Sequence, residues 1–176
     1  HDTKRLSMSG GWRLPRIGSL GEVMDFNLSL RGDMYHATNL PIAGQGGTDS
    51  GIAGRIYPEA SVNWKFPLAR TQGRITQTLE PVASATISPN GGNPSAIPNE
   101  DSLDLELDDT NLFSSSRFSG LDRVEGGPRF SYGVKWAATG ISGGNSSFFV
   151  GQSYRVRDDD TFGEGSGLED NFSDIV

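Results

Sequence analysis

Apolar and polar residues alternate along several long segments of this chain, and this alternation constrains the fold more than any other feature. Between residues 24 and 31, apolar residues occupy the even positions and polar residues the odd ones. Successive side chains of a β-strand point to opposite faces, so this segment predicts a strand with one apolar and one polar face. Similar alternation recurs near residues 6–14, 56–68, 75–87, 124–138 and 148–156. The apolar residues shift to odd positions in the 75–87 segment, and no helical period competes with these patterns.

The connections between these segments alternate in length. Short ones fall near Ile17–Gly21, Arg70–Gly73 and Thr139–Asn145, and long polar ones near Ala37–Gly51, Ser88–Gly120 and Asp159–Asn171. Short turns on one side and long loops on the other are typical of outer-membrane barrels. The sequence therefore predicts an all-β fold: an antiparallel up-and-down transmembrane β-barrel segment of about six strands. Because about eight strands is the smallest closed barrel, this segment is expected to be part of a larger one.

Composition fits this prediction and excludes other classes. The apolar fraction is 34% and the mean hydropathy is −0.42, averages that a barrel also gives because only every second strand residue meets lipid. The net charge of −7 argues against nucleic-acid binding. Cysteine is absent, which excludes disulfides and thiol-metal sites within this stretch. The chain starts at His1 without a signal peptide, so residues 1–176 are expected to be a fragment of a longer barrel protein.

Aromatic residues provide a second indication. Trp12, Trp64 and Trp136 all lie on the apolar parity a few residues from a short turn, and Phe148 leaves the turn that Trp136 enters. Antiparallel threading would place the four near one membrane boundary. They are therefore expected to form an aromatic girdle.

Charge is distributed unevenly between strands and loops. The polar strand parity carries mostly basic residues, whereas the loops are acidic. The candidate basic strip on the inner face consists of Arg123, Arg129, Lys135, Arg155 and Arg157. Arginine recognises phosphates and carboxylates well, so the strip could contact an anionic ligand. Structural pairing with Glu125 and loop acids is an equal alternative.

Three sequence segments resemble the LptD family. They are Arg74–Pro81 (RITQTLEP), Asn111–Glu125 (NLFSSSRFSGLDRVE) and Gly151–Tyr154 (GQSY), in matching order and spacing. The SGLDR core at Ser119–Arg123 is the most specific, and the three segments together anchor about Ile56 to Val156.

The resemblance implies a function. LptD proteins have a periplasmic β-jelly-roll followed by a very large barrel in the outer membrane of Gram-negative bacteria. The barrel is plugged by the lipoprotein LptE. It receives lipopolysaccharide from the periplasmic Lpt bridge and delivers it to the outer leaflet through a lateral opening. By resemblance, this chain is an interior part of that barrel, without the jelly-roll, the lateral-gate strands or the family's disulfide cysteines. Its implied partners are lipopolysaccharide, an LptE-like plug, outer-membrane lipids and, through the missing N-terminal domain, the bridge.

The family motif places Gly120, Leu121, Asp122 and Arg123 where the longest loop re-enters the barrel. We expect a structural role for Asp122 and Arg123, with Ser88–Gly120 folding inward or capping the mouth. Direct contact with the substrate is the alternative, because loops often carry function.

No catalytic constellation is visible, so the chain is not expected to be an enzyme. His36 follows a strand end and is interpreted as a surface residue, and no serine has a base partner at readable spacing. No cofactor is expected. The acidic segments Asn99–Asp109 and Asp158–Asp160 have the oxygen ligands that Ca²⁺ and Mg²⁺ prefer, but solvated loops explain them better. Two alternatives to the LptD interpretation remain at this stage: a porin-like anion-selective channel and a soluble β-sandwich adhesin.

Overall fold

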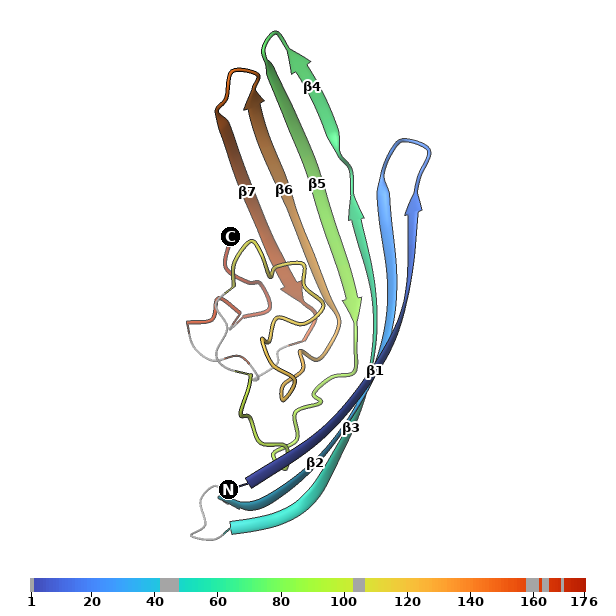
Figure 1. The fold of residues 1–176 in the computed structure, drawn as a ribbon, viewed down its shortest axis with the longest axis vertical. Helices are drawn as coiled ribbons and strands as arrows, with labels where there is room; N and C mark the ends of the chain where they lie inside the picture. The colour runs from blue at the N-terminus through green and yellow to red at the C-terminus, as the bar shows by residue number, and fades with distance from the viewer. Residues whose placement is uncertain (1, 42–47, 103–106, 158–161, 163–164, 169) are drawn as a thin grey trace.

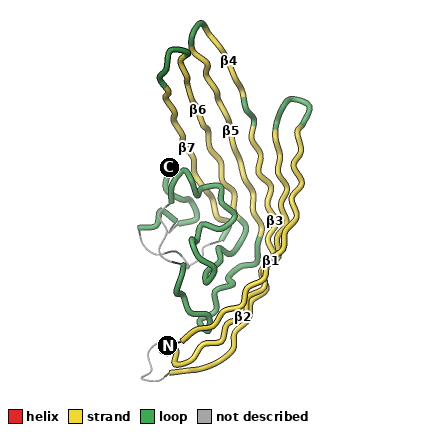
Figure 2. Tube along the Cα trace, in the orientation of Figure 1, coloured by secondary structure: helices red, strands yellow, loops and turns green. Residues whose placement is uncertain are grey.

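The computed structural model describes residues 2–41, 48–102, 107–157, 162, 165–168 and 170–176. It is an all-β structure built on one antiparallel sheet (Figures 1 and 2), which confirms the predicted fold class. The strands are β1 (Asp2–Ile17), β2 (Val23–Pro41), β3 (Thr48–Lys65), β4 (Leu68–Gln72), β5 (Ile75–Ile87), β6 (Arg129–Gly140) and β7 (Asn145–Arg155). The described residues contain no helix that is long and apolar enough to cross a membrane.

The strands form an up-and-down meander. Their order is β1-β2-β3-β5-β6-β7, with β4 paired to β5 beyond the end of β3. The sheet is open, because β1 and β7 lie at its two ends and are not paired with each other. This arrangement is that of a section of barrel wall.

Two prolines explain why the structure has seven strands where the sequence predicted about six. The expected strand through residues 56–68 is split into β3 and β4 at Phe66 and Pro67. Phe66 donates its backbone N–H to Pro81 O (3.0 Å), but Pro81 has no N–H to return and neither has Pro67. The register against β5 is the same on both sides of the gap, so β3 and β4 follow one line.

The predicted short turns all lie at one end of the sheet, and the long connections leave the other end (Figure 1). The β4–β5 turn has only two residues, Gly73 and Arg74, with Gly73 at a φ of 61°. Because Gln72 pairs with Ile75 across this turn, the outward parity changes from even to odd, as the alternation predicted. At the other end, β2 and β3 reach further than the predicted loop 37–51 allowed.

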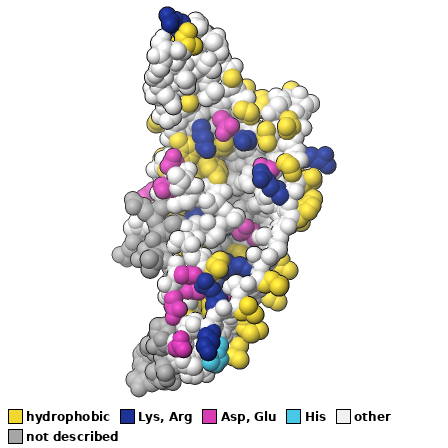
Figure 3. All heavy atoms as spheres, viewed as in Figure 1, with side chains coloured by type: hydrophobic (Ala, Val, Ile, Leu, Met, Phe, Trp, Pro, Cys, Tyr) yellow, Lys and Arg dark blue, Asp and Glu magenta, His cyan; other side chains and the backbone are white. Residues whose placement is uncertain are grey.

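The two faces of the sheet differ sharply. Apolar side chains on the outer face are exposed, for example Leu6 (70%), Met8 (81%) and Ile56 (77%). Figure 3 shows such side chains along the edge formed by β1–β3. The buried apolar cluster instead lies among the loops on the inner side: Leu107, Leu112 and Leu168, packed against Phe113, Phe149, Phe162 and Val176. In a soluble β-sandwich the apolar strand face would be the buried one.

The last described residues lie along the free edge of β7. Arg155 N–H donates to Asn171 O (2.7 Å), and Ser173 N–H donates to Ser153 O (2.8 Å). Gly151 and Val176 exchange two backbone hydrogen bonds of 2.9 and 3.0 Å. This segment therefore pairs with β7 in antiparallel fashion, and its backbone satisfies part of an edge that would otherwise be open.

Candidate functional site

The described part of the connection between β5 and β6, residues 88–102 and 107–128, folds back against the inner face of the sheet (Figure 1). The prediction that the fifth expected strand begins near Arg123 is wrong, because the corresponding strand, β6, begins at Arg129 and residues 123–128 belong to this inner loop. The alternation there was broken by Gly126 and Gly127. Gly127 has a φ of 88°, and a Cβ at Gly126 would lie 2.6 Å from Gly91 O, so this stretch is packed tightly as a loop.

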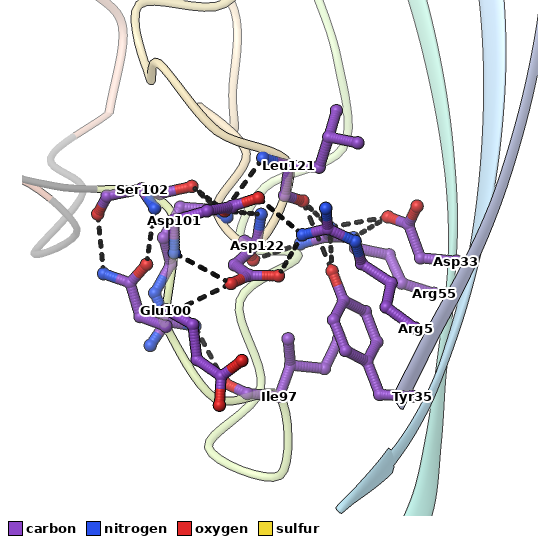
Figure 4. Close-up of polar contacts among 12 residues, drawn as sticks. Arg5, Asp33, Tyr35, Arg55, Ile97, Glu100, Asp101, Ser102, Leu121 and Asp122 are labelled. Atoms are coloured by element: carbon purple, nitrogen blue, oxygen red, sulfur yellow. Dashed lines mark hydrogen bonds and ion pairs between the residues drawn. The ribbon is translucent and has the colours of Figure 1, made fainter. Parts of the chain in front are cut away.

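The family-motif residues form a clasp at the centre of the loop (Figure 4). Asp101 Oδ1 accepts the N–H groups of Leu121 (3.0 Å) and Asp122 (2.9 Å). In return, Asp122 Oδ2 accepts those of Glu100 (2.8 Å) and Asp101 (3.1 Å). Two segments about 20 residues apart are thus joined by two carboxylates, each accepting hydrogen bonds from the other segment's backbone.

Arg5 ties this clasp to β1. Its guanidinium contacts Asp101 (2.6 Å) and Asp122 (2.7 Å). Burial by itself would raise the pKa of Asp101, but the Arg5 guanidinium and the backbone N–H groups outweigh it, so the pKa lies well below its usual range. The charged form of Asp101 is therefore the one that the folded loop stabilises.

A second anchor comes from β2 and β3. Arg55 and Asp33 form a buried ion pair (2.6 Å) on the inner face. The same guanidinium donates to the carbonyl oxygens of Leu121 (2.7 Å), Asp122 (3.0 Å) and Gly92 (2.9 Å). Figure 4 shows Arg5, Asp33, Tyr35 and Arg55 converging from the strands on the Leu121–Asp122 turn. Planar guanidinium groups suit this work because they offer five donors in a fixed geometry.

A third anchor joins the loop to β6 and β7. Arg117 is fully buried and pairs with Glu125 (2.9 Å), and it donates to Ser153 Oγ (2.6 Å). Burial lowers the pKa of Arg117 to about 10, although Glu125 opposes the shift. Arg117 is not among the site residues predicted from the sequence. The only signal was its position inside the NLFSSSRFSGLDRVE segment.

The predicted basic strip is not one continuous surface. Arg129 pairs in register with Arg155, and both are buried beneath the loops, where Arg129 donates to Ser115 O and Arg155 to Leu168 O. Arg123 lies in the loop and donates to Ile97 O (3.2 Å). Arg157 is exposed just beyond β7.

Of the residues in the predicted basic strip, Lys135 is the one that lies on a strand and is exposed. It faces Glu80 across the β5–β6 pair, and its ammonium group lies 5.9 Å from the Phe149 ring centre. These residues border a cavity of about 990 Å³ between the inner face and the loops, which Asp108 and Asp174 also line. Phe149, which broke the sequence alternation, points into the apolar cluster of the loops.

The four predicted girdle residues lie on the outer face. Trp12 is level in register with Ala60 of β3, and Trp64 lies four residues nearer the short turns. Trp136 is displaced by the same amount from Tyr132, the residue level with Trp64, and Trp136 pairs with Phe148. Each of these displacements is four residues over two strands, or two residues per strand. Residues displaced in this way lie at one height in the membrane if the strands are tilted by about 54° from the membrane normal. Outer-membrane barrels are usually tilted by about 35–45°, so the four residues form a shallow slope.

The acidic segments are only partly described. Asp158–Asp160 and residues 103–106 lie outside the described residues, and Asp101 is occupied by Arg5 and backbone N–H groups. Elsewhere in the described chain, no group of three acidic or histidine side chains is arranged to hold a metal ion. A divalent cation at the acidic loops stays a prediction.

An open antiparallel meander with an exposed apolar outer face, and with a polar inner face covered by its own loop, defines the wall of a transmembrane β-barrel. Comparison with protein families agrees: the model of the family described as "LptD: LPS transport system D" matches residues 1–176. The chain belongs to the LptD family, whose members serve lipopolysaccharide transport and assembly at the outer membrane of Gram-negative bacteria and are not known as enzymes. The match favours this family over the porin and adhesin alternatives. A search of curated proteins gave no match.

Proposed function

We propose that this chain forms part of the barrel wall through which lipopolysaccharide is delivered to the outer leaflet, and that loop 88–128 covers the barrel interior near its long-loop end. The observation that best supports this proposal is that buried or half-buried arginines from several strands, among them Arg5 and Arg55, hold one loop against the sheet. A loop fixed in this way narrows the interior while leaving the outer face free for lipid. The chain itself would then reside in the outer membrane.

We assign the open part of the inner face to a lipoprotein plug of the LptE type. The loop covers the half of the sheet near the long connections, and the cavity beside Glu80, Lys135 and Phe149 lies at the margin of the loop, where Asp108 forms part of its wall. This cavity combines apolar walls with charges of both signs, which suits a protein surface. Contact with the periplasmic bridge would belong to an N-terminal domain of the whole protein.

Lys135 is the member of the predicted basic strip best placed to contact lipopolysaccharide or the plug. Arg129 and Arg155 are buried and each donates hydrogen bonds to loop carbonyls, so both help to hold the loop. Lys135 is instead exposed on its strand, where its ammonium group is accessible to a ligand.

The test is charge reversal in the full-length protein. Lys135→Glu should reduce lipopolysaccharide at the cell surface or the amount of lipoprotein that copurifies. Lys65→Glu, a charge reversal at an exposed inner-face residue that does not line the cavity, serves as the control and should alter neither. If Lys135→Glu leaves both measurements at the wild-type level, the proposed contact is wrong.

A further inference from the structure

The outer face of the sheet has a hollow where small residues replace large apolar side chains. It has a volume of about 630 Å³ and lies over β1, β2, β3 and the end of β5. One border is a rung of residues paired directly across four strands: Trp12, Leu28, Ala60 and Ile87. Except for Ala60 these are large and exposed, at 54%, 53% and 66% for Trp12, Leu28 and Ile87.

Small residues make the floor of the hollow. Gly10 pairs with Leu30, and Leu30 pairs with Pro58, forming the second rung. A Cβ added at Gly10 would meet no atom within 4 Å, so the space above it is open. Together with Ala60, Gly10 leaves a trough between the side chains of Trp12, Leu28 and Leu30.

The trough is long enough for part of a lipid chain. It begins at Trp12, which lies on the aromatic slope, and follows the rung across the strands towards Ile87. Because barrel strands are tilted by about 35–45°, this direction is inclined to the membrane normal and leads away from the short-turn side. Three strand spacings of about 4.8 Å make it roughly 14 Å long, close to half of the roughly 30 Å hydrocarbon core. Its surface is almost entirely apolar.

We propose that this trough binds one acyl chain of a phospholipid of the periplasmic leaflet, with the headgroup beside Trp12. The short turns of an outer-membrane barrel face the periplasm, so a chain that starts at Trp12 and runs away from them lies in that leaflet. An indole at the headgroup level suits this placement. The inference rests on the proposed membrane position of the chain and adds a specific lipid site to it.

The test compares two glycines of the outer face in the full-length protein. Gly10→Leu fills the trough, whereas Gly32→Leu is the matched control, because Gly32 also has open space around a Cβ and lies outside the trough. Native mass spectrometry of the purified protein, titrated with phosphatidylethanolamine, measures bound lipid. We expect Gly10→Leu to bind roughly tenfold more weakly than wild type and Gly32→Leu to match it.

A second variant guards against misfolding. Ala60→Phe fills the same trough from β3, and the heat-dependent gel shift of folded barrels reports whether each variant is intact. Equal phospholipid binding by wild type and both folded trough variants would overturn the inference, as would purified lipopolysaccharide displacing the phospholipid at equal concentration. Failure here would leave the barrel-wall proposal standing, because that proposal is tested by surface lipopolysaccharide.

Discussion

Asp101 and Asp122 accept hydrogen bonds from each other's backbone N–H groups, at 2.9 Å onto Asp101 Oδ1 and 3.1 Å onto Asp122 Oδ2. Arg5 of β1 forms ion pairs with both carboxylates. The arrangement turns two loop segments into one unit and fixes that unit to the sheet. The SGLDR motif therefore contains Leu121 and Asp122, through which Arg5 and Arg55 hold the loop.

Removing Asp122 should release the loop. Asp122→Ala leaves the N–H groups of Glu100 and Asp101 without their acceptor in a half-buried place, at a cost of at least about 2 kcal/mol in loop docking. Limited proteolysis of the full-length protein should therefore cut within residues 88–128 faster than in wild type. Arg13→Ala breaks the exposed Arg13–Asp25 ion pair and should leave the rate unchanged. Equal cleavage in all three proteins would refute the clasp.

Replacing Arg55 should lower the free energy of unfolding even where the positive charge is kept. Arg55→Lys keeps the charge but loses most of the donors that reach Leu121, Asp122 and Gly92. Arg55→Met also removes the buried partner of Asp33 and leaves its carboxylate only the part-buried Arg31 (3.0 Å), which should cost about 3 kcal/mol in unfolding free energy. Urea titration of the purified protein measures this.

The double variant Asp33→Asn with Arg55→Met distinguishes the pair from simple packing. The double variant removes the buried Asp33 carboxylate together with its Arg55 partner, so it should be more stable than Arg55→Met alone. A double variant as unstable as the sum of the two single changes would show that the pair is not coupled.

Loop docking should weaken in acid. The folded-state pKa of Asp101 lies below its unfolded value of about 3.9, so its contribution is fully present above that value and is lost as pH falls towards the folded pKa. Hydrogen exchange at the N–H groups of Leu121 and Asp122, corrected for intrinsic rates, should show docking free energy falling below about pH 5. Asp101→Asn should flatten this dependence. A variant that keeps the wild-type slope would assign it to another group.

Two adjacent glycines offer a test of the loop packing. Gly92 has a φ of 100°, and its added Cβ would lie 2.8 Å from Val124 Cγ2, so Gly92→Ala should destabilise the docked loop by about 1–3 kcal/mol. Gly91 also has a positive φ, 72°, but its Cβ would meet open space. Gly91→Ala should therefore cost less in the same proteolysis assay. Equal losses would mean that backbone strain alone, and not the contact with Val124, matters.

Much of the sheet could be predicted from the sequence because strand alternation is a local property. The parity of Leu28, Trp64 and Trp136, the short turns and even the parity change at Gly73 follow from neighbours in the chain. The split at Phe66 and Pro67 could not be predicted in this way, because it also depends on Pro81 of the neighbouring strand. The sequence of a single segment does not show which residues will pair with it.

The loop anchors could not be predicted in the same way. Arg5 and Asp122 are separated by 117 positions, and Asp33 meets Arg55 only because β2 and β3 pair in this register. The sequence did place Asp122 and Arg123 at the return of an inward loop. It extended the strand too far, to Arg123, because alternation in Arg123–Glu125 continues by chance across residues that belong to the loop.

The central claim is that one face of this sheet meets lipid and the other the barrel interior, and alternating accessibility along β2 tests it most directly. Spin labels placed one at a time at Asn27, Leu28, Ser29 and Leu30 of the full-length protein in bilayers would be exposed to oxygen, which partitions into lipid, and to a water-soluble nickel complex. We predict high oxygen accessibility at Leu28 and Leu30 and low values at Asn27 and Ser29, with the nickel complex showing no access at the two leucines. Equal oxygen accessibility at all four positions, or the nickel complex reaching Leu28 and Leu30, would contradict the account.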